Sequence, residues 1–499
     1  MNPVTLTGDT LTFDDFYRVV FDNAPVNIAG ESLQKLEKGR KVLFDLASSG
    51  MQIYGMNVGV GWNKDKSIPQ NFYPAYNRNL ILAHCVGLPP YASENDVRAM
   101  LLARLNIMLI GSSGASPELA QFYAEMLNRR IHPLVPETGS VGQADIGLMS
   151  FVGLAVIGEG QVFYKGQVTG AKEALAQEGL APMQLGPKEG LSIVSSNGVG
   201  LGQAALVIKE IETALSAANT IYCASLEALN GNVSPFDPRA LKLKRDAGSL
   251  ATGETLREHL KGSFLHESDS ARPLQDPLCF RNTVHIHGAL REMLDYTKER
   301  LLRAINAGED NPSLLIDEMQ VIPTSNFEPV NWVLGMEALA IGLSHVANAS
   351  CLRTIKLANP AFTGLPRFLT PEGDSQVLGF ATIQKTYTAQ YAKIRHLAAP
   401  ASLDSFPLAG EIEDKGTNSP YVVQRLRQIT DALFDILALE LLHAAQGQDF
   451  RLQAGKTLGA ATGKAHASVR AAVSFLSADR VLAYDILALK KIIVSGKLI

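Results

Sequence analysis

Long apolar stripes in the second half of the chain most constrain its fold. Between residues 203 and 226, apolar side chains recur every three or four positions, at Ile211, Leu215, Ala218, Tyr222 and Leu226. Similar stripes occur around residues 339–346, across residues 431–445, and from residue 469 to the C-terminus. Helices that are this apolar over several turns are unstable alone in water and pack into bundles. The sequence therefore predicts a mainly α fold with a central bundle of long helices.

The first 200 residues have a different character. They are rich in glycine and proline, mix short helical runs with loops, and contain one expected hairpin at residues 160–168. We therefore predict a loop-rich N-terminal part at residues 1–200, and a part at residues 201–499 that holds the central bundle and the C-terminal helices. Two polar segments, residues 306–312 and 410–418, are expected to precede helices, where bundle proteins often place polar sites.

Composition excludes several classes of function. Apolar residues make up 46% of the 499 residues, which is enough for a large core and argues against disorder. The net charge is −4 without a basic block, so neither nucleic acid nor a membrane is an expected partner. The four cysteines are far apart and predict neither a disulfide framework nor a metal site. The N-terminus lacks the pattern of a signal peptide, so we expect a cytoplasmic protein.

A tyrosine followed by three glycines lies at residues 54–61, which have the sequence YGMNVGVG. Such a loop can bring the phenol of Tyr54 over a pocket. It is not a phosphate-binding loop, because no Lys-Ser/Thr pair follows it. On its own, the segment favours the simpler interpretation of a glycine-rich turn with a packed tyrosine.

Further segments follow this loop along the chain. They are NLILAHCVG (79–87), NRRIHPLVPETGSVG (128–142), KEGLSIVSSNG (188–198), QDPLCFRNTVHIHG (275–288), INAGEDNP (305–312), SNFEP (325–329), LAAPAS (397–402) and IEDKG (412–416). With these segments the sequence resembles the histidine, phenylalanine and tyrosine ammonia-lyases, whose YGxNTGFG, GSVG, EGLALxNG, QDxYSxR, DNP and QED motifs have counterparts here. A single match would be weak, but the whole series in the right order makes the resemblance specific.

The resemblance implies a predominantly helical ammonia-lyase-like fold that assembles as a homotetramer, with each active site drawing residues from three subunits. Stripes too apolar to be covered within one subunit favour the same assembly. The resemblance also implies removal of ammonia from an aromatic amino acid by an electrophile called MIO. MIO is an imidazolone ring made from an Ala-Ser-Gly tripeptide: the serine loses water, and the third amide nitrogen attacks the first carbonyl.

This chain departs from the family at that tripeptide. Where the family has GSVGASGD, this chain has GSVGQAD. With the aspartate aligned, the triad becomes Gly142-Gln143-Ala144. Glutamine has no β-hydroxyl to eliminate, and the serine of the GSVG turn is followed by a bulky valine that opposes ring closure. We therefore expect no MIO group and no other cofactor.

The resemblance assigns roles to several residues that remain. Tyr54 matches the catalytic base, and Arg281 matches the arginine that holds the substrate carboxylate, a task suited to a bidentate guanidinium. Asn311 and Glu413 match further pocket positions. His84 matches a substrate-selecting position, where a histidine resembles the histidine-selective members. We expect the Tyr54 loop to close over a pocket that contains these four residues and binds a small-molecule substrate.

Other matched positions are altered. Ser195 stands where the family has an asparagine, although Asn197 lies two residues further on, and Leu278-Cys279 replaces a tyrosine-serine pair. We include Ser195 and Asn197 among the candidate substrate-binding residues. Taken singly, each candidate has a structural interpretation, such as an ion pair, a solvated carboxylate or a core histidine. Together, at the positions of the family, they favour a working polar pocket.

Three functions are compatible with these residues. The first is an MIO-independent enzyme that carries out an elimination or proton shift on a small carboxylic or acyl substrate, with Tyr54 as base. A tyrosine base needs a pKa well below its ordinary value of about 10, and Arg281 or helix N-termini are expected to lower it. The second is a catalytically silent homologue that serves as a binding or partner subunit. The third is a conventional histidine-type ammonia-lyase, which the missing tripeptide disfavours.

Overall fold

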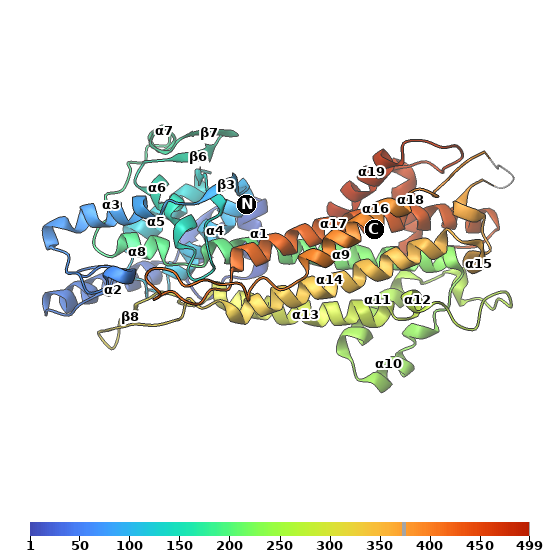
Figure 1. Ribbon diagram of the computed structural model, residues 1–499, viewed down its shortest axis with the longest axis horizontal. Coiled ribbons are helices and arrows are strands. Elements are labelled where there is room, and N and C mark those ends of the chain that lie inside the picture. The colour runs from blue at the N-terminus through green and yellow to red at the C-terminus, as the bar shows by residue number, and fades with distance from the viewer. Residues whose placement is uncertain (372–375, 499) are drawn as a thin grey trace. The chain divides into compact units, whose positions relative to one another are not determined.

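The computed structural model describes residues 1–371 and 376–498, which fold predominantly into helices (Figure 1). They form two compact units. The first unit comprises Met1–Leu206, Thr297–Leu334 and Pro400–Gln424, and the second comprises Val207–Tyr296, Gly335–Ala399 and Arg425–Ile499. The mainly α prediction is confirmed. The predicted parts, 1–200 and 201–499, differ from these units because two later segments of the chain fold with the first 206 residues.

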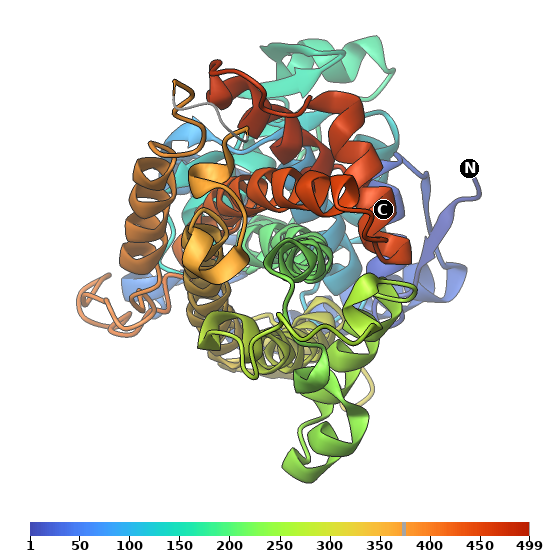
Figure 2. The ribbon, with the colours of Figure 1, turned by 90° about the vertical axis from the view of Figure 1, so that its right-hand side faces the viewer.

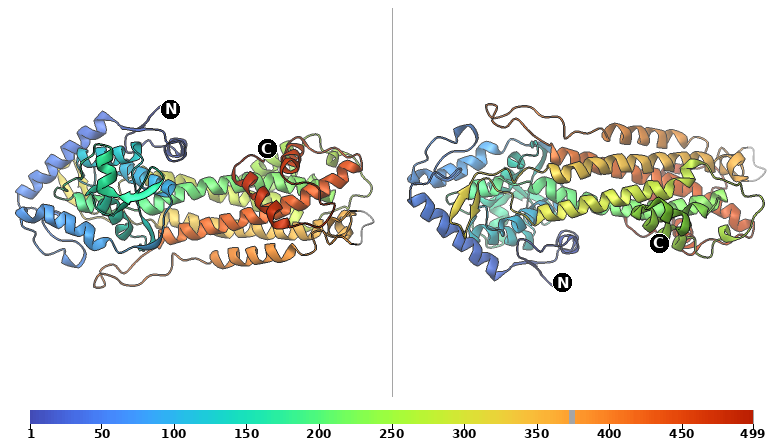
Figure 3. Two further views of the ribbon diagram at one scale, coloured as in Figure 1. Left: turned by 90° about the horizontal axis from the view of Figure 1, so that it is seen from above. Right: turned by 90° about the horizontal axis from the view of Figure 1, so that it is seen from below.

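The second unit is organised around long helices. They are α9 (Gly198–Leu229), α13 (Thr283–Ile305), α14 (Val330–Leu357) and α17 (Ser419–Gln453), each of which also contributes one end to the first unit. Their parts in the second unit run side by side in Figures 1 and 3, and Figure 2 shows the bundle from one end. Ser225 of α9 donates to Glu440 of α17 (2.7 Å), so these two helices are neighbours. These helices carry three of the predicted apolar stripes, so the expected long-helix bundle is confirmed.

Shorter helices cover the bundle in the second unit. They are α10 (Pro238–Lys244), α11 (Ala247–His259), α12 (Leu278–Arg281), α15 (Pro360–Thr363), α16 (Gln384–Leu397), α18 (Ala460–Ala472) and α19 (Leu482–Val494). A buried cluster that includes Tyr222, Phe236 and Phe280 joins α9 to this layer. Burial of such large aromatic side chains is a main source of stability in a helical domain.

Two expectations about helix boundaries were wrong. The stripe from residue 469 to the C-terminus is interrupted between α18 and α19, because tertiary hydrogen bonds replace helical ones there. Gln446 accepts the N–H of Leu476 (3.0 Å) and donates to its carbonyl (3.2 Å). Residues 306–312 follow the end of α13 and lead into a strand rather than a helix, whereas residues 410–418 lead into α17 as expected.

The first unit packs short helices around the buried helix α4 (Glu94–Met108). Every side chain from Asp96 to Met108 is buried, and Ser93 begins the helix with a capping box to Asp96. The other helices are α1 (Phe13–Phe21), α2 (Gly30–Ser48), α3 (Tyr73–His84), α5 (Pro117–Asn128), α6 (Ile146–Val156), α7 (Ala171–Gln177) and α8 (Glu189–Val194). Helices α3, α6 and α8 pack on one another.

Small sheets complete the first unit. The parallel pair is β1 (Val4–Leu6) with β2 (Val26–Ile28), and the antiparallel pairs are β3 (Leu88–Tyr91) with β5 (Pro136–Thr138) and β8 (Ser313–Leu315) with β9 (Gln320–Ile322). A three-stranded sheet has the order β4 (His132–Pro133), β6 (Gln161–Tyr164), β7 (Gln167–Gly170). The hairpin predicted at residues 160–168 is confirmed as β6–β7.

Within the described residues, two helical stretches are long and apolar enough to cross a membrane by length and composition alone. The most apolar window of Glu189–Leu229 is wholly buried in the structure, and that of Val330–Leu357 is 56% buried. Because core helices of soluble proteins meet the same criterion, neither stretch by itself indicates a membrane.

Candidate active site

The first unit contains a cavity of about 390 Å³ built from loops and helix ends. Its lining residues are Tyr54, Gly61, Lys64, Gln143, Ala144, Ile146, Leu191, Ser195, Asn311, Pro312, Pro323, Phe327, Ile412 and Glu413. The glycine-rich loop, the start of α6, the end of α8, the loops flanking β8–β9 and the segment before α17 therefore meet at one place. Mostly apolar walls with a few polar groups are the usual composition of a small-molecule site.

The Tyr54 loop is held in a defined conformation by its own hydrogen bonds. The N–H of Gly61 donates to the phenol oxygen of Tyr54 (2.6 Å), and the side chain of Asn57 bonds the Ile53 N–H and the Met51 carbonyl just before the loop. Gly55 has a φ of +71°, and a Cβ there would lie 2.3 Å from the Leu191 side chain, so only glycine fits. The loop thus presents the Tyr54 phenol to the cavity.

The surroundings of Tyr54 raise the pKa of its phenol, contrary to the expectation from sequence. Burial is the largest cause, the Gly61 N–H opposes it, and the Glu413 carboxylate adds to it. Arg281, the expected source of a lowered pKa, is a residue of the second unit. A phenol in this environment stays protonated near neutral pH until a positive charge is brought beside it.

The segment at residues 140–145 forms one wall of the cavity and is fixed by hydrogen bonds. Gly142 has a φ of +72°, and its carbonyl accepts a hydrogen bond from Thr417 Oγ1 (3.0 Å). The N–H of Ala144 donates to Asn197 Oδ1 (3.2 Å). Both backbone groups that would have to react to form an MIO ring therefore have other partners.

This segment does not fit the ring-forming tripeptide that the family resemblance implies. Ring formation needs a middle residue that can lose water, but Gln143 has no hydroxyl. Its carboxamide instead donates to Glu328 Oε2 (2.7 Å). The third amide nitrogen would also have to attack the first carbonyl, whereas the Ala144 N–H and the Gly142 carbonyl are both engaged elsewhere.

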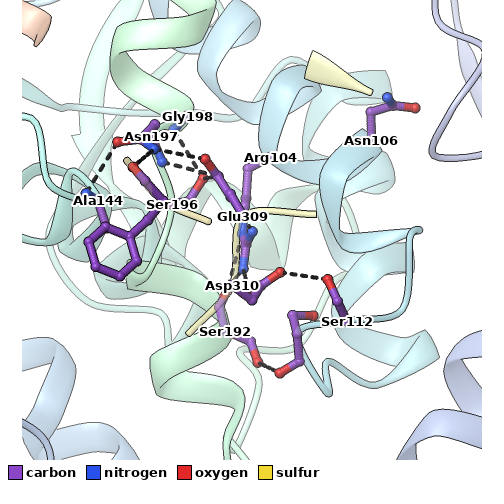
Figure 4. Close-up of polar contacts among 12 residues, drawn as sticks. Arg104, Asn106, Ser112, Ala144, Ser192, Ser196, Asn197, Gly198, Glu309 and Asp310 are labelled. Carbon is purple, nitrogen blue, oxygen red and sulfur yellow. Dashed lines mark hydrogen bonds and ion pairs between the residues drawn. The ribbon is translucent and has the colours of Figure 1, made fainter. Parts of the chain in front are cut away.

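Asn197 lies behind the cavity wall in a buried network (Figure 4). Ser196 Oγ (2.5 Å) and the Asn197 N–H (3.1 Å) donate to Glu309 Oε1, and Asn197 Nδ2 donates to Glu309 Oε2 (3.0 Å). Arg104 of α4 donates to Asp310 Oδ1 (2.8 Å), and its Nη1 lies 3.8 Å from Glu309 Oε1. Burial raises the pKa of Glu309 to about 7, although Arg104 opposes this effect.

The cavity brings together four of the residues predicted from sequence, namely Tyr54, Ser195, Asn311 and Glu413, with Gln143 and Ala144 of the altered tripeptide. Asn311 is oriented by its side-chain oxygen, which accepts a backbone N–H (3.0 Å). The backbone of Glu413 forms a two-way hydrogen-bonded bridge with Leu408. The side chains thus project from anchored backbone.

His84 and Arg281 do not line this cavity. His84 ends α3, where its Nδ1 lies 2.7 Å from the Leu80 carbonyl oxygen. Arg281 belongs to α12 of the second unit and lines a cavity of about 310 Å³ there with Asp276 and His285. The pocket expected to contain Tyr54 together with His84 and Arg281 stays a prediction.

Sequence reasoning missed four residues at this site: Lys64 and Phe327, which line the cavity, and Glu309 and Glu328, which bond to residues of its wall. A signal was present for each of them. Lys64 follows the Tyr54 loop by three residues, Phe327 and Glu328 are part of SNFEP, and Glu309 is part of INAGEDNP. A motif marks a segment, but only the packing decides which of its side chains faces a cavity.

Comparison with known proteins decides the family. The sequence pattern of the aromatic amino acid lyases matches residues 11–471. The chain belongs to the aromatic amino acid lyase family. The resemblance drawn from the motifs and the ammonia-lyase-like fold are thereby confirmed, and the chain is an enzyme of the lyase type.

Members of this family that are similar to the chain have different activities. Histidine ammonia-lyase from Treponema denticola is 34% identical over 498 residues, which are 99% of this chain and 97% of that protein. The structure of ergothionase from Treponema denticola, an ergothioneine-degrading enzyme in complex with desmethyl-ergothioneine sulfonic acid, matches with a TM-score of 0.96 and 42% identity, covering 100% of both chains. Tyrosine aminomutase from Streptomyces globisporus matches with a TM-score of 0.94 and 27% identity, over 99% of this chain and 97% of that one. The family alone therefore does not fix the substrate.

Proposed function

We propose that this chain is an MIO-independent lyase that eliminates an amine from a small betaine, with ergothioneine as the first candidate substrate and Tyr54 as the base. One observation carries the proposal: the cavity keeps Tyr54, Asn311 and Glu413 but has Gln143 at the position where the family forms its electrophile. The 42% identity to ergothionase supports the choice of substrate.

The chemistry of a betaine explains why such an enzyme needs no electrophile. Ergothioneine is a histidine derivative with a trimethylated amino nitrogen and a sulfur on its imidazole ring. A quaternary nitrogen already carries the positive charge that makes it a good leaving group, whereas the amine of an ordinary amino acid is a poor one. Activation by a covalent adduct is therefore unnecessary for this substrate.

The proposed reaction is a 1,2-elimination. The phenolate of Tyr54 takes a proton from the β-carbon, and the C–H electron pair forms the Cα=Cβ double bond. The Cα–N bond breaks, its electron pair leaves with the nitrogen, and neutral trimethylamine departs. The products are trimethylamine, an unsaturated acid that keeps the sulfur-bearing imidazole ring, and a protonated Tyr54, which returns its proton to water.

The raised pKa of Tyr54 fits this substrate class. Burial and Glu413 both oppose ionisation of the phenol, so the resting enzyme holds it protonated. A substrate that carries a permanent positive charge would favour the phenolate when it binds. Lys64, on the same cavity wall, supplies a second cation that can pair with the substrate carboxylate or with the phenolate.

We further propose a cytoplasmic homotetramer in which Arg281 and His84 reach an active site shared between subunits. Leu334, Ile341 and Leu352 support self-association, since they are 56%, 48% and 38% exposed on α14 despite their apolar character. Light scattering at micromolar concentration should give the mass of four chains. A stable monomer would contradict the shared site.

The test of function is a substrate panel with two product assays. Ergothioneine should yield trimethylamine and a product absorbing in the near ultraviolet, because the new double bond extends the ring conjugation. Histidine, phenylalanine and tyrosine should yield no measurable ammonia. Intact mass should equal that of the unmodified chain, whereas a deficit of about two waters would show that the tripeptide had cyclised.

A conventional histidine ammonia-lyase is the second candidate, because relatives with 30–34% identity over nearly the whole chain have that name. Rapid release of ammonia from histidine would establish it and refute the main proposal. Absence of turnover with every compound of the panel, together with tight binding of one of them, would instead favour a catalytically silent homologue.

A further inference from the structure

We propose, building on the function proposed above, that Glu309 is a positioning residue for the elimination: through Asn197 it fixes the backbone at Ala144 and Gln143 in the cavity wall. Glu309 itself does not line the cavity and touches no reacting atom. Its action runs through two hydrogen-bonded steps, which Figure 4 shows from Glu309 to Asn197 and on to Ala144.

The first step is a carboxylate surrounded by donors. Glu309 is only 5% exposed. Both of its oxygens accept hydrogen bonds, from Ser196 Oγ, from the Asn197 N–H and from Asn197 Nδ2, at 2.5–3.1 Å. The guanidinium of Arg104 adds a positive charge at 3.8 Å. An ionised carboxylate satisfies all of these donors at once, so the hydrogen-bond donors around Glu309 match its charged form.

The second step is the orientation of the Asn197 amide. Its Nδ2 lies between two acceptors, Glu309 Oε2 (3.0 Å) and the Phe327 carbonyl (2.7 Å). Rotating the amide by 180° would place its oxygen against both of these acceptors. The amide oxygen is therefore directed to the Ala144 N–H, with which it bonds at 3.2 Å.

The backbone at Ala144 depends on its hydrogen bond to Asn197. Ala144 has a φ of +51°, in the left-handed region that a residue with a Cβ rarely adopts. Ala144 and its neighbour Gln143 both line the cavity, as does Phe327, whose carbonyl is the other partner of Asn197. Non-covalent bonds from Glu309 and Asn197 thus fix the wall that faces the substrate.

The charged groups that act on Glu309 make its hydrogen bonds to Asn197 dependent on pH. Arg104 from α4 favours its ionisation and Asp310 from its own segment opposes it, while burial is the largest effect and raises the pKa of Glu309 to about 7. Protonation of Glu309 turns one of its accepting oxygens into a donor, although Ser196 and Asn197 already donate to it. The hold on Asn197 should therefore weaken as the pH falls below about 7, and kcat should fall with it.

The decisive variant is Glu309→Gln, which keeps the volume but turns one acceptor into a donor. We expect kcat for ergothioneine to fall about 100-fold, the usual cost of a small displacement of active-site groups, with KM changed by less than about 3-fold. Asn197→Ala should lower kcat by a similar factor, and the double variant should be no worse than either single one, because both break the same chain of contacts. The acid limb of the kcat profile near pH 7 should disappear in Glu309→Gln.

Glu440→Gln is the matched control. Glu440 is a buried glutamate paired with a buried arginine in the second unit, and its partners do not line the Tyr54 cavity. It should lower the melting temperature without changing kcat per folded enzyme or the pH profile. If Glu309→Gln behaves as this control does, Glu309 is merely structural and the proposal is overturned. Full kcat in Asn197→Ala would overturn it as well, even if Glu309→Gln does not fold.

A crystal-structure comparison separates this proposal from the proposed function. If the wild-type enzyme does not turn over ergothioneine, the proposed function fails. The positions of residues 144 and 197 in crystal structures of Glu309→Gln and Asn197→Asp still test the positioning role. Loss of the Ala144–Asn197 hydrogen bond in Glu309→Gln supports the proposal. An unchanged backbone at residues 143–145 overturns it.

Discussion

Each unit of the molecule buries an arginine beside a glutamate, and the pair in the second unit is complete. Arg353 donates from Nε to Glu440 Oε1 (2.6 Å) and from Nη2 to Oε2 (2.8 Å). Ser225 (2.7 Å) and Ser350 (2.5 Å) donate to the same two oxygens. These residues belong to α9, α14 and α17. Arg353 also donates to the Cys279 carbonyl of α12 (3.3 Å) and to Thr283 Oγ1 of α13 (3.0 Å), so the network stays among helices of the second unit.

The pair in the first unit is incomplete and leads to a cavity. Arg104 donates to Asp310 Oδ1 (2.8 Å) and, from Nε, to the Ser192 carbonyl (2.9 Å), and its Nη1 has no hydrogen-bond partner among the described residues. Glu309 instead accepts hydrogen bonds from Ser196 and Asn197. Asn197 in turn accepts the N–H of Ala144 in the cavity wall.

Comparison of the two networks separates a structural from a functional buried charge. A carboxylate whose oxygens are fully paired with a bidentate guanidinium and two hydroxyls contributes to the specificity and cohesion of a bundle. A carboxylate held by weaker donors, with its pKa raised to about 7 and a route to a cavity, is placed where its charge state can affect chemistry.

The largest effect is expected at a pair of tyrosines, one in each unit. Tyr54→Phe should lower turnover by about two to four orders of magnitude, the range for loss of a positioned general base. Ligand affinity and folding should be nearly unchanged, because the variant loses one hydrogen bond, from the Gly61 N–H. Steady-state kinetics and thermal unfolding measure both quantities.

Tyr222→Phe is the matched control in the second unit. Its buried hydroxyl donates to the Phe280 carbonyl (3.0 Å), so the variant should lose about 1 kcal/mol of stability and keep its turnover. Full activity of Tyr54→Phe would show that the cavity tyrosine is as structural as Tyr222, and a binding role would then replace the proposed chemistry.

The next effect concerns the closed network. Glu440→Ala removes the partner of Arg353 and leaves a buried, unpaired guanidinium, so it should lower the free energy of unfolding by about 3–5 kcal/mol. Chemical denaturation measures the loss. Asn197→Ala, which ends the open network of the first unit but leaves the Arg104–Asp310 bond intact, should lose less stability and more turnover. The reverse order would mean that the two networks have the same role.

The parts of the fold that follow from local periodicity could be predicted from sequence. The stripe at residues 211–226 lies within α9, and the stripe at residues 431–445 lies within α17. The stripe beyond residue 469 misled, because the bonds of Gln446 to Leu476 interrupt the helix, and those bonds join residues 30 positions apart. Periodicity carries no information about such partners.

The candidate site could likewise be predicted only in part from sequence. Tyr54, Asn311 and Glu413 could be named because they stand in motifs, and they do line one cavity. The direction of the Tyr54 pKa could not be predicted, since it depends on burial and on a carboxylate more than 350 positions away. The role of Glu309 depends on an asparagine 112 positions away in the sequence.

A smaller effect is expected at two glycines of the first unit. Gly142 has a φ of +72°, and a Cβ there would lie 2.3 Å from the Ser419 backbone nitrogen; Gly50 has a φ of +92° with open space around it. Gly50→Ala should cost about 1 kcal/mol from backbone strain alone. Gly142→Ala should cost about 1–3 kcal/mol more, because the backbone must move, and should also reduce turnover. Equal costs would mean that residues 140–145 tolerate displacement.

The smallest effect is a pH dependence that has opposite signs in the two units. In the second unit, burial lowers the pKa of His443 from 6.5 to about 4. The unfolded chain then binds a proton that the folded chain does not bind, so stability is lost as the pH falls from about 6.5 towards 4, by about 1 kcal/mol at pH 6.

In the first unit, burial raises the pKa of Glu309 from 4.5 to about 7. The folded chain then binds the extra proton, so stability is lost as the pH rises from about 4.5 to 7.

Unfolding free energies of His443→Asn and Glu309→Gln at pH 6 and 7 separate these two effects. On acidification from pH 7 to 6, His443→Asn should lose less stability than wild type, and Glu309→Gln should lose more. If both buried variants change the slope in the same direction, the two units do not differ in how their buried titratable groups respond to pH.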